Sequence, residues 1–441
     1  MNQTRVKVRF APSPTGPFHI GGVRTALFNY LFARQSSGEF LLRIEDTDRE
    51  RSRPEFEQEI LNSLRWLGLE WDGSIVRQSE RLPVYQRYAQ ELLSLGVAYQ
   101  SEGAVKFRIP KQKISFPDLV HGMVEFDSES FDDFVIQKTN GFPTYNFACV
   151  VDDHEFTITH LIRGDDHLPN TPRQILLYEA FGWKTPSFAH LPLVLGKSGE
   201  PLSKRDGEVN FKFYRENGFI PDGILNYLSL LGWSAGGNQE FFLRNDLVKQ
   251  FSLKRIHKTS ATFDLEKMKW VNGEHLRILS DREFVEHGCA YLEERVTIPG
   301  RLSHAALSEI ILLYRSRIRI WSDLLWQAKY FWEDEVEYDQ EAVKEYFEDP
   351  KTSRYLSHLK ESLELLPLFS DISAIEQCLR TLAEKLQCPA RALIHPARIA
   401  LTGKSVSPGL FEVMKLLGRE IVLKRLKKAA DSLQKETWHE R

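Results

Sequence analysis

Three charged residues could together bind a small molecule that carries charges of both signs. Arg9 and Glu45 lie at the ends of two strand-like segments, and Arg163 lies in a stretch rich in β-branched and aromatic residues. Their two positive charges and one negative charge complement the two carboxylates and the ammonium of free glutamate or aspartate. For each residue taken singly, a surface salt bridge is an equally good interpretation.

A glycine-bearing turn near the N-terminus could bind the phosphates of a nucleotide. The segment His19-Ile20-Gly21-Gly22 separates a strand pattern from a helix pattern. Glycines let the backbone approach a nucleotide, and the N-terminus of a helix attracts phosphate. A histidine there can donate to phosphate oxygens as they gain charge. The same four residues alone are also typical of an ordinary tight turn.

Two later loops hold further candidates. Residues 203–207, with the sequence SKRDG, place two adjacent cations in a loop with flanking glycines, which suits a mobile clamp on a triphosphate. A solvated basic loop is the simpler interpretation of this string alone. Residues 163–167, with the sequence RGDDH, could bind Mg²⁺ or the ribose hydroxyls of ATP, or could cap the next helix, and local spacing does not decide among the three.

The elements that position these residues follow from the periodicity of the apolar side chains. Residues 5–10 alternate with period two and predict a strand with one covered face. A helix that opens at Gly21-Gly22 is predicted to end at Gly38, and the apolar run 40–44 predicts a buried parallel strand. Strand, turn, helix and strand make a βαβ unit, whose ligands bind beyond the carboxyl ends of the strands.

The rest of the chain alternates between helical and strand-like regions. Residues 53–99 predict helices, residues 104–165 predict strands inserted between two halves of the nucleotide-binding sheet, and residues 191–195 predict another buried strand. A helix is predicted over 222–231, and the pattern from about 303 onward is almost wholly helical. At roughly 150 residues per domain, the length suggests about three domains.

Composition indicates a soluble globular protein of 441 residues, with 42% hydrophobic residues, 27% charged residues and a net charge of −3. No apolar run reaches the roughly 18 residues that span a bilayer, and the N-terminus lacks a signal-peptide core, so we expect a cytoplasmic protein with no membrane partner. The four cysteines form no CxxC or CxC pair, which argues against a zinc site. Basic stretches at 315–319 and 424–428 could follow an RNA backbone, although a solvated helix face is the ordinary interpretation.

The chain resembles the bacterial-type glutamyl-tRNA synthetases, which are class I aminoacyl-tRNA synthetases, over almost its whole length. The resemblance rests on segments in one order: RFAPSPTGPFHIGGVRTALFNYLFAR with FLLRIEDTDRERS, VRQSERLPVYQRYAQELLSLGVAY, PTYNFACVVDDHEFTITHLIRGDDHLPNTPRQI, LSKRDG, FDLEKMKWVNGEHLR and ALTGKSVSPGLFEVMKLLGRE. It implies an α/β Rossmann-type catalytic domain in two halves with an inserted α+β connecting domain that binds the acceptor arm, then a stem-contact domain and an all-α anticodon-binding domain. These would span, in that order, residues 1–98 and 181–235, 99–180, 236–302 and 303–441.

The resemblance also implies roles for individual residues. The substrate pocket would be formed by Arg9 at the side-chain carboxylate, by Ser13 and Glu45 at the amino group, and by Tyr145 and Arg163. The ATP site would be formed by Pro14, Thr15, His19, Gly21, Gly22, Asp166 and Lys204. The catalytic residues would be His19, Ser203, Lys204 and Arg205. Arg9 would favour glutamate over glutamine, because a neutral amide leaves a buried guanidinium uncompensated.

The implied reaction has two steps. The α-carboxylate of L-glutamate attacks the α-phosphorus of ATP and yields glutamyl-adenylate with pyrophosphate; the terminal adenosine of tRNA(Glu) then takes the glutamyl group. Mg²⁺ is expected to accompany ATP, no zinc is expected, and we expect a monomer. Members of this family typically need bound tRNA before they activate glutamate, and we expect the same here. The sequence does not decide whether tRNA(Gln) is also charged.

Three departures from the family pattern concern the site. Pro201 stands where the family usually has a lysine, which removes one phosphate contact and could lower the rate. Cys149 stands where some members have asparagine beside the amino-acid pocket, and a thiol is a poor hydrogen-bond partner. Many relatives carry a longer segment near residues 99–108, often with zinc-binding cysteines, so contacts with the acceptor arm could differ here.

Overall fold

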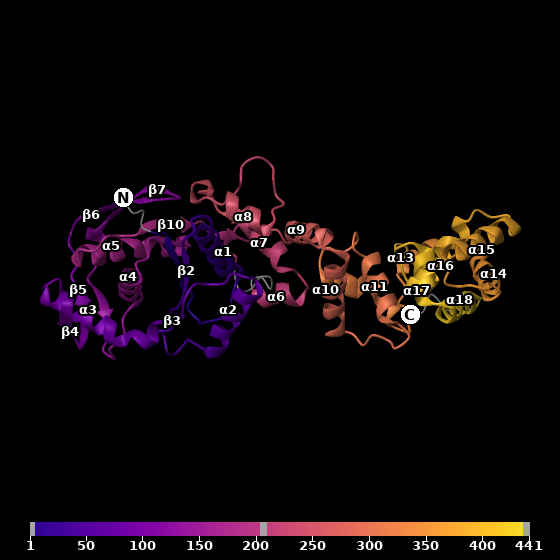
Figure 1. The fold of residues 1–441 in the computed structure, drawn as a ribbon, viewed down its shortest axis with the longest axis horizontal. Helices are drawn as coiled ribbons and strands as arrows, with labels where there is room; N and C mark the ends of the chain where they lie inside the picture. Colours follow the sequence, from indigo (N-terminus) through magenta and orange to yellow (C-terminus); the bar gives the residue numbers. More distant parts are fainter. Residues whose placement is uncertain (1–4, 203–209, 435–441) are drawn as a thin grey trace. The chain divides into compact units, whose positions relative to one another are not determined.

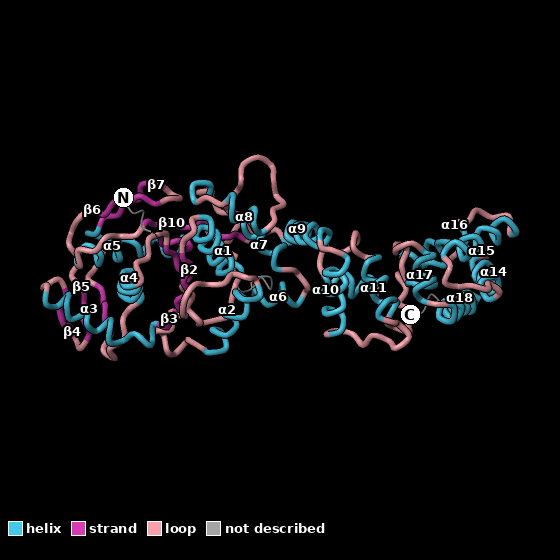
Figure 2. Tube along the Cα trace, in the orientation of Figure 1, coloured by secondary structure: helices cyan, strands magenta, loops and turns pink. Residues whose placement is uncertain are grey.

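The computed structural model describes residues 5–202 and 210–434, and the chain forms two compact units, residues 1–275 and 276–441 (Figure 1). Figure 2 shows that the described strands all belong to the first unit and that the described part of the second unit is built from helices and loops. None of the described helices is long and apolar enough to cross a membrane. This division agrees with an α/β catalytic part followed by a helical part.

The first unit contains twelve described strands: β1 (Lys7–Phe10), β2 (Glu39–Ile44), β3 (Val76–Arg77), β4 (Ala98–Ser101), β5 (Ala104–Phe107), β6 (Lys113–Asp118), β7 (Gly122–Asp127), β8 (Phe134–Gln137), β9 (His160–Gly164), β10 (Ser187–Leu191), β11 (Val194–Leu195) and β12 (Ala261–Thr262). Its described α-helices are α1 (Ile20–Gln35), α2 (Pro54–Trp66), α3 (Leu82–Ser94), α4 (Tyr145–Glu155), α5 (Thr171–Ala180), α6 (Phe211–Glu216), α7 (Pro221–Leu230), α8 (Arg244–Gln250) and α9 (Leu265–Ile278), the last of which runs past the boundary.

The strands that position the site belong to two parallel groups. One group has the order β3-β2-β1, and the other has the order β7-β6-β10-β9, with β7 antiparallel to β6. The groups meet where the amide of Thr159 donates to the carbonyl oxygen of Lys7 at 2.9 Å, so that β1 and β9 lie side by side. The chain leaves β1 toward β2 on one side, whereas β9 leads to β10 on the other. This is the switch point at which α/β sheets bind ligands.

Helix α1 lies against the switch point and follows the turn after β1. The imidazole of His19 caps its N-terminus, and α1 ends at Gln35. Gly38 is required for space rather than for a left-handed conformation, because a Cβ there would lie 2.4 Å from the carbonyl oxygen of Val6. The left-handed residue in this turn is Ser37, with φ of 50°. The predicted βαβ unit is therefore confirmed, with a different reason for its glycine.

Three local predictions need correction. Both faces of β1 are covered, since Arg9 is buried as well as Val8. Residues 145–155, predicted as strand, form helix α4; its Val150 and Val151 are buried, and burial all round the helix outweighs their strand preference. The strand predicted over 191–195 is β10, which begins at Ser187 and ends at Leu191, and Pro192, which has no amide hydrogen, separates it from the short β11.

Outside the central sheet, β4-β5-β8 form a separate antiparallel sheet. An apolar core joins this sheet to α3, α4 and α5, with Tyr85, Phe107, Phe147 and Tyr178 fully buried in it. The described α-helices that belong wholly to the second unit are α10 (Asp281–Glu293), α11 (His304–Leu313), α12 (Trp321–Gln327), α13 (Gln340–Tyr346), α14 (Thr352–Glu364), α15 (Ile372–Lys385), α16 (Arg391–Thr402), α17 (Leu410–Leu417) and α18 (Arg419–Gln434). The domain boundaries inferred from sequence stay predictions.

Candidate active site

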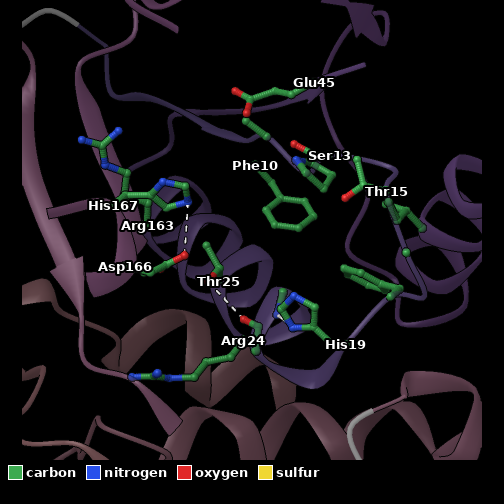
Figure 3. A pocket seen from close by; sticks show the side chains of 18 of the residues that line it. Phe10, Ser13, Thr15, His19, Arg24, Thr25, Glu45, Arg163, Asp166 and His167 are labelled. Atoms are coloured by element: carbon green, nitrogen blue, oxygen red, sulfur yellow. Dashed lines mark hydrogen bonds and ion pairs between the residues drawn. The ribbon is translucent and has the colours of Figure 1, made fainter. Parts of the chain in front are cut away.

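A cavity of about 970 Å³ lies beyond the carboxyl ends of β1, β2, β9 and β10 (Figure 3). Ten of the residues predicted from sequence line it: Arg9, Ser13, Thr15, His19, Gly21, Gly22, Glu45, Tyr145, Arg163 and Asp166. Pro14 is buried and is absent from the cavity wall, although its neighbours line it. The predicted Ser203, Lys204 and Arg205 lie outside the described residues, whereas Pro201 lines the cavity.

His19 has a defined tautomer at the mouth of this cavity. Its Nδ1 accepts the amide hydrogen of Gly22 at 3.0 Å, so the proton of the neutral imidazole resides on Nε2. The side chain is exposed and can present that N–H to a ligand. Gly22 permits this turn, because a Cβ would lie 2.8 Å from Cε2 of the buried Phe18. The turn formed by residues 19–22 thus pairs a helix N-terminus with an imidazole N–H donor, an arrangement that suits anion binding.

Arg9 lines the cavity and is also held in a buried ion pair within the protein. Its Nε lies 3.1 Å from Oδ1 of Asp153, and Nη1 of Arg43 lies 2.6 Å from the same oxygen. Burial alone would raise the pKa of Asp153, but the charges of Arg43 and Arg9 outweigh it and lower that pKa. Asp153 therefore stays ionised between two guanidinium groups. The expectation that a neutral amide would leave Arg9 uncompensated therefore needs correction, because Asp153 already provides a negative partner for Arg9.

Glu45 is also paired within the protein. Nη2 of Arg43 lies 2.9 Å from Oε1 of Glu45, and Sγ of Cys149 donates to the same oxygen at 3.2 Å. The sulfur in turn lies 3.5 Å from Nη2 of Arg43. Burial, together with the charge of Glu45, raises the pKa of the Cys149 thiol well above its ordinary value, so the thiol is neutral and can donate. Cys149 thus belongs to the charge network of the pocket.

Asp152, next to Asp153 on α4, behaves differently. Its carboxylate accepts from Nε of Arg81 at 2.8 Å, from Gln78 at 2.9 Å and from the hydroxyl of Tyr85 at 2.9 Å. Burial raises its pKa, and the charge of Arg43, whose Nε lies 3.7 Å from Oδ2, together with Gln78 and Arg81 offsets only part of that effect. Two adjacent carboxyl groups in one helix therefore have pKa shifts of opposite sign.

The buried wall carries a net positive charge once these partners are included. Arg9, Arg43 and Arg163 have three formal positive charges, and Glu45 and Asp153 have two negative ones, which leaves one positive charge. The total does not change when the neighbouring charges are added, because Arg24, which lines the cavity, is offset by Asp118 behind His190, and Asp152 is offset by Arg81. The charge count from three residues also gave one positive charge, because the two partners it omitted cancel each other. A ligand with one net negative charge complements this wall.

Arg163, at the end of β9, carries the unpaired part of that charge. Its Nε and Nη2 contact His190 at 3.2 Å and Thr171 at 2.9 Å, whereas its Nη1 is buried with no partner among the described residues. The hydroxyl of Tyr145 contacts Nδ1 of His167 at 2.9 Å on the same side of the cavity. Figure 3 shows Arg163 and His167 on one side of the cavity and His19 on another. This arrangement offers an acidic ligand a buried N–H donor.

Comparisons with known proteins agree with this geometry. The family model described as "tRNA synthetases class I (E and Q), catalytic domain" matches residues 5–104 and 100–270, and the model "Anticodon binding domain" matches residues 283–430. A glutamate–tRNA ligase of Syntrophomonas wolfei is 39% identical over 99% of this chain and 98% of its own, and one of Thermosipho melanesiensis is 40% identical over 98% and 99%. The chain belongs to the glutamate–tRNA ligases.

A solved glutamate tRNA ligase from Elizabethkingia meningosepticum, in complex with its amino acid, superimposes with a TM-score of 0.85. It is 32% identical, and the superposition covers 98% of this chain and 100% of that one. Because the coverage is almost complete, the aligned residues include both units. The predicted class I architecture, with a helical anticodon-binding part, is thereby confirmed for this ligase.

Sequence reasoning missed several residues of this ligase that complete the site. They are charged or polar residues inside apolar segments: Arg43 in FLLRI, Asp152 and Asp153 in ACVVDD, and His190 in FAHLPL. Such a residue must find a buried partner, because an isolated charge in a core costs several kcal/mol. That rule could have grouped them with Arg9 and Arg163 as one network. It could not have paired them, since the partners lie more than 100 residues apart in several cases.

Proposed function

We propose that this ligase activates L-glutamate with ATP in the cavity and transfers the glutamyl group to the terminal adenosine of tRNA(Glu). The single observation that carries the assignment of the amino-acid pocket is the buried wall with one net positive charge, in which an N–H of Arg163 has no partner among the residues that the structure describes. Glutamate carries one net negative charge and glutamine carries none. Neutral glutamine would leave the wall uncompensated, which disfavours it.

Within this proposal, Arg9 and Arg163 face the two carboxylates of glutamate, and Glu45 and Ser13 face its ammonium. Asp153 and Arg43 hold Arg9 and Glu45 in fixed positions, so the pocket is organised before the substrate enters. Tyr145 lines the same pocket.

ATP would lie over the first turn of α1. The Nε2–H of His19 and the backbone near Gly21 and Gly22 face its phosphates, and Thr15 and Asp166 line the same cavity. Attack by the α-carboxylate of glutamate on the α-phosphorus forms the P–O bond of glutamyl-adenylate as the bond to pyrophosphate breaks. Mg²⁺ enters with ATP as part of the substrate and neutralises phosphate charge.

We also propose that the ligase works as a monomer in the cytoplasm and needs bound tRNA before it activates glutamate. The match of residues 283–430 to an anticodon-binding model supports recognition of the tRNA by the second unit. Light scattering on purified protein tests the first proposal. Exchange of pyrophosphate into ATP, measured with and without tRNA, tests the second.

Charging of purified tRNA(Glu) and tRNA(Gln), each with labelled glutamate and ATP, tests the function directly. Charging of tRNA(Glu) alone is the expected result. Charging of both would indicate a ligase that does not discriminate between the two. If neither is charged while tRNA still binds, the chain is a tRNA-binding protein that has lost catalytic activity. Pro201 and the shortened insertion would then be the first features to test as the cause.

Lys204→Ala separates chemistry from binding in the same assay. The substitution should lower adenylate formation strongly while binding of tRNA survives, because the lysine is proposed to follow the phosphates and not the RNA. Unchanged adenylate formation would remove Lys204 from the clamp. Lys197→Ala is the matched control, because Lys197 lies in the same segment between β11 and α6 but outside the SKRDG sequence.

A further inference from the structure

A chain of hydrogen-bonded, buried polar side chains runs from Arg163 into the protein; we call Arg163, Thr171, His190 and Asp118 the relay. Arg163 contacts His190 and Thr171, and the hydroxyl of Thr171 lies 3.0 Å from Nε2 of His190. Nδ1 of His190 lies 2.7 Å from Oδ2 of Asp118. Each of these four residues is at most 4% exposed. They come from β9, α5, β10 and β6; His190 and Thr171 contact the guanidinium group directly, and Asp118 reaches it through His190.

The positions of the protons in this chain follow from the contacts. A guanidinium group can only donate, so Nε2 of His190 accepts from Nε of Arg163. The proton of His190 is then on Nδ1 and is donated to Asp118. Asp118 also accepts the amide hydrogens of Val120 at 2.8 Å and His121 at 2.9 Å, which suits an ionised carboxylate.

The pKa shifts of the two titratable groups agree with this assignment. Burial lowers the pKa of His190, which keeps its imidazole neutral. Burial alone would raise the pKa of Asp118, but the hydrogen bonds from His190 and from the backbone bring that pKa below its ordinary value. The relay therefore contains an ionised aspartate, a neutral histidine and a guanidinium group. Arg163 donates to His190, and His190 donates to Asp118.

This chain holds two of the three nitrogens of the Arg163 guanidinium group and leaves the third for a ligand. Nε and Nη2 are bonded to the protein, whereas Nη1 is buried with no partner among the described residues. A buried donor without a partner is costly, and a carboxylate entering the cavity would satisfy it. The side chain can meet that carboxylate only if its other two nitrogens stay where they are.

Asp118 ties this arrangement to the segment that sequence assigns to the acceptor-arm insertion. It is the last residue of β6, it pairs in register with Phe188 of β10, and it precedes the turn to β7. Figure 1 shows β6 and β7 beside β10 at one end of the sheet. A displacement of the β6–β7 hairpin would therefore be transmitted through His190 to Arg163.

We propose that Asp118, His190 and Thr171 are positioning residues that orient Arg163 toward a substrate carboxylate and connect the inserted β6–β7 hairpin to amino-acid recognition. This inference rests on the proposed function, because it takes Arg163 to be a residue of the glutamate pocket. It assigns roles to three residues that do not line the cavity.

Asp118→Asn tests the relay without a change of shape. The amides of Val120 and His121 both donate to Oδ1, so the asparagine oxygen should take that position. Its NH₂ group should then face Nδ1 of His190 and also the backbone N–H of His190, which donates to Oδ2 at 3.2 Å in the wild type. That NH₂ group donates to Nδ1 of His190, so the histidine proton moves to Nε2. The Nε2–H of His190 and the Nε–H of Arg163 are then two donors that face each other. We expect KM for glutamate to rise about 10-fold to 100-fold, as for a lost hydrogen bond to a charged group. KM for ATP should change less than about twofold.

His190→Gln is the rescue variant, because its amide can donate to Asp118 and accept from Arg163 as the neutral imidazole does. It should retain more glutamate affinity than His190→Leu, which can do neither. Thr171→Val and Thr171→Ser form a second matched pair. The valine removes the oxygen that accepts from Nη2 of Arg163 and should raise KM for glutamate, whereas the serine keeps it.

Charging of tRNA(Glu) by the wild-type protein is measured first, together with thermal stability of every variant. Folded Asp118→Asn and Thr171→Val proteins with the wild-type KM for glutamate would overturn the relay and leave the proposed function intact. So would an equal rise of both KM values that follows the loss of stability, since that indicates a purely structural role. Failure of the wild-type protein to charge any tRNA would overturn both.

Discussion

Replacing Asp153 with asparagine should destabilise the first unit by about 3–5 kcal/mol, the cost of removing one partner from a buried ion pair. The carboxylate lies 3.1 Å from Nε of Arg9 and 2.6 Å from Nη1 of Arg43, and all three side chains are at most 5% exposed. Asparagine preserves the shape of the side chain but leaves two guanidinium groups facing each other. The formal charge of the pocket wall also rises from one to two.

Asp152→Asn provides the matched control, because the two residues are adjacent, buried and nearly identical in shape. The carboxylate of Asp152 is shared among Arg81, Gln78 and Tyr85, and Arg81 is partly exposed. Its loss should therefore cost only about 1.5–3 kcal/mol, as for a hydrogen bond to a charged group.

The two variants should differ in the sign of their pH dependence. The pKa of Asp153 is lowered in the folded state, so its stabilisation is present above the unfolded value of about 3.9 and is lost as pH falls through the folded value. The pKa of Asp152 is raised, so its ionised form becomes a penalty as pH rises from about 3.9 through the folded value. The cost of Asp153→Asn should shrink at acid pH, and that of Asp152→Asn should grow.

Urea denaturation followed by circular dichroism, repeated between about pH 3.5 and 7, measures both effects. The transition of the first unit can be recognised because saturating glutamate with ATP should shift it to higher urea. Equal losses in the two variants at pH 7, or pH dependences of the same sign, would refute the view that Asp153 is the ionised centre of the network.

Three further results are expected. Gly22→Ala should lower the free energy of unfolding by about 1–3 kcal/mol, because its Cβ would lie 2.8 Å from a ring carbon of buried Phe18. Gly21→Ala, with 3.2 Å to the imidazole of His19, should cost less when both are compared by thermal denaturation. Iodoacetamide should leave Cys149 unmodified in native protein, because burial raises the pKa of its thiol, and should modify it after denaturation, as peptide mass spectrometry can show. Metal analysis should find no stoichiometric zinc, and one zinc per chain would contradict the prediction from the shortened insertion.

The positions of the site could be predicted from sequence because strand ends and glycine turns are local signals. Arg9, His19, Glu45 and Arg163 each follow from a short apolar run or a turn, and the structure brings all four to one cavity. Their roles in catalysis and binding stay predictions. The helical second part was also predictable, since its apolar periodicity is local.

The partners of these residues could not be predicted, because they are set by packing between distant segments. Asp153 lies on a helix whose valines favour strand, and it is 144 residues from Arg9 in the chain. Pro192 ends β10 at a point where the apolar run alone continues. Long-range pairing of this kind decides which charges of the pocket are already neutralised. The charge count made from Arg9, Glu45 and Arg163 alone did not contain that information.

The pairing of β1 with a segment far along the chain has a consequence for synthesis. The amide of Thr159 bonds to Lys7 across 152 residues, and β10 is complete only at Leu191. At about 5–20 residues per second, a ribosome needs roughly 10–40 s to reach that point. During this time the open edge of β1 can pair with other chains. The nascent ligase should therefore depend on protection of its first 40 residues, whereas its helical second part, with contacts closer in sequence, should fold soon after it emerges.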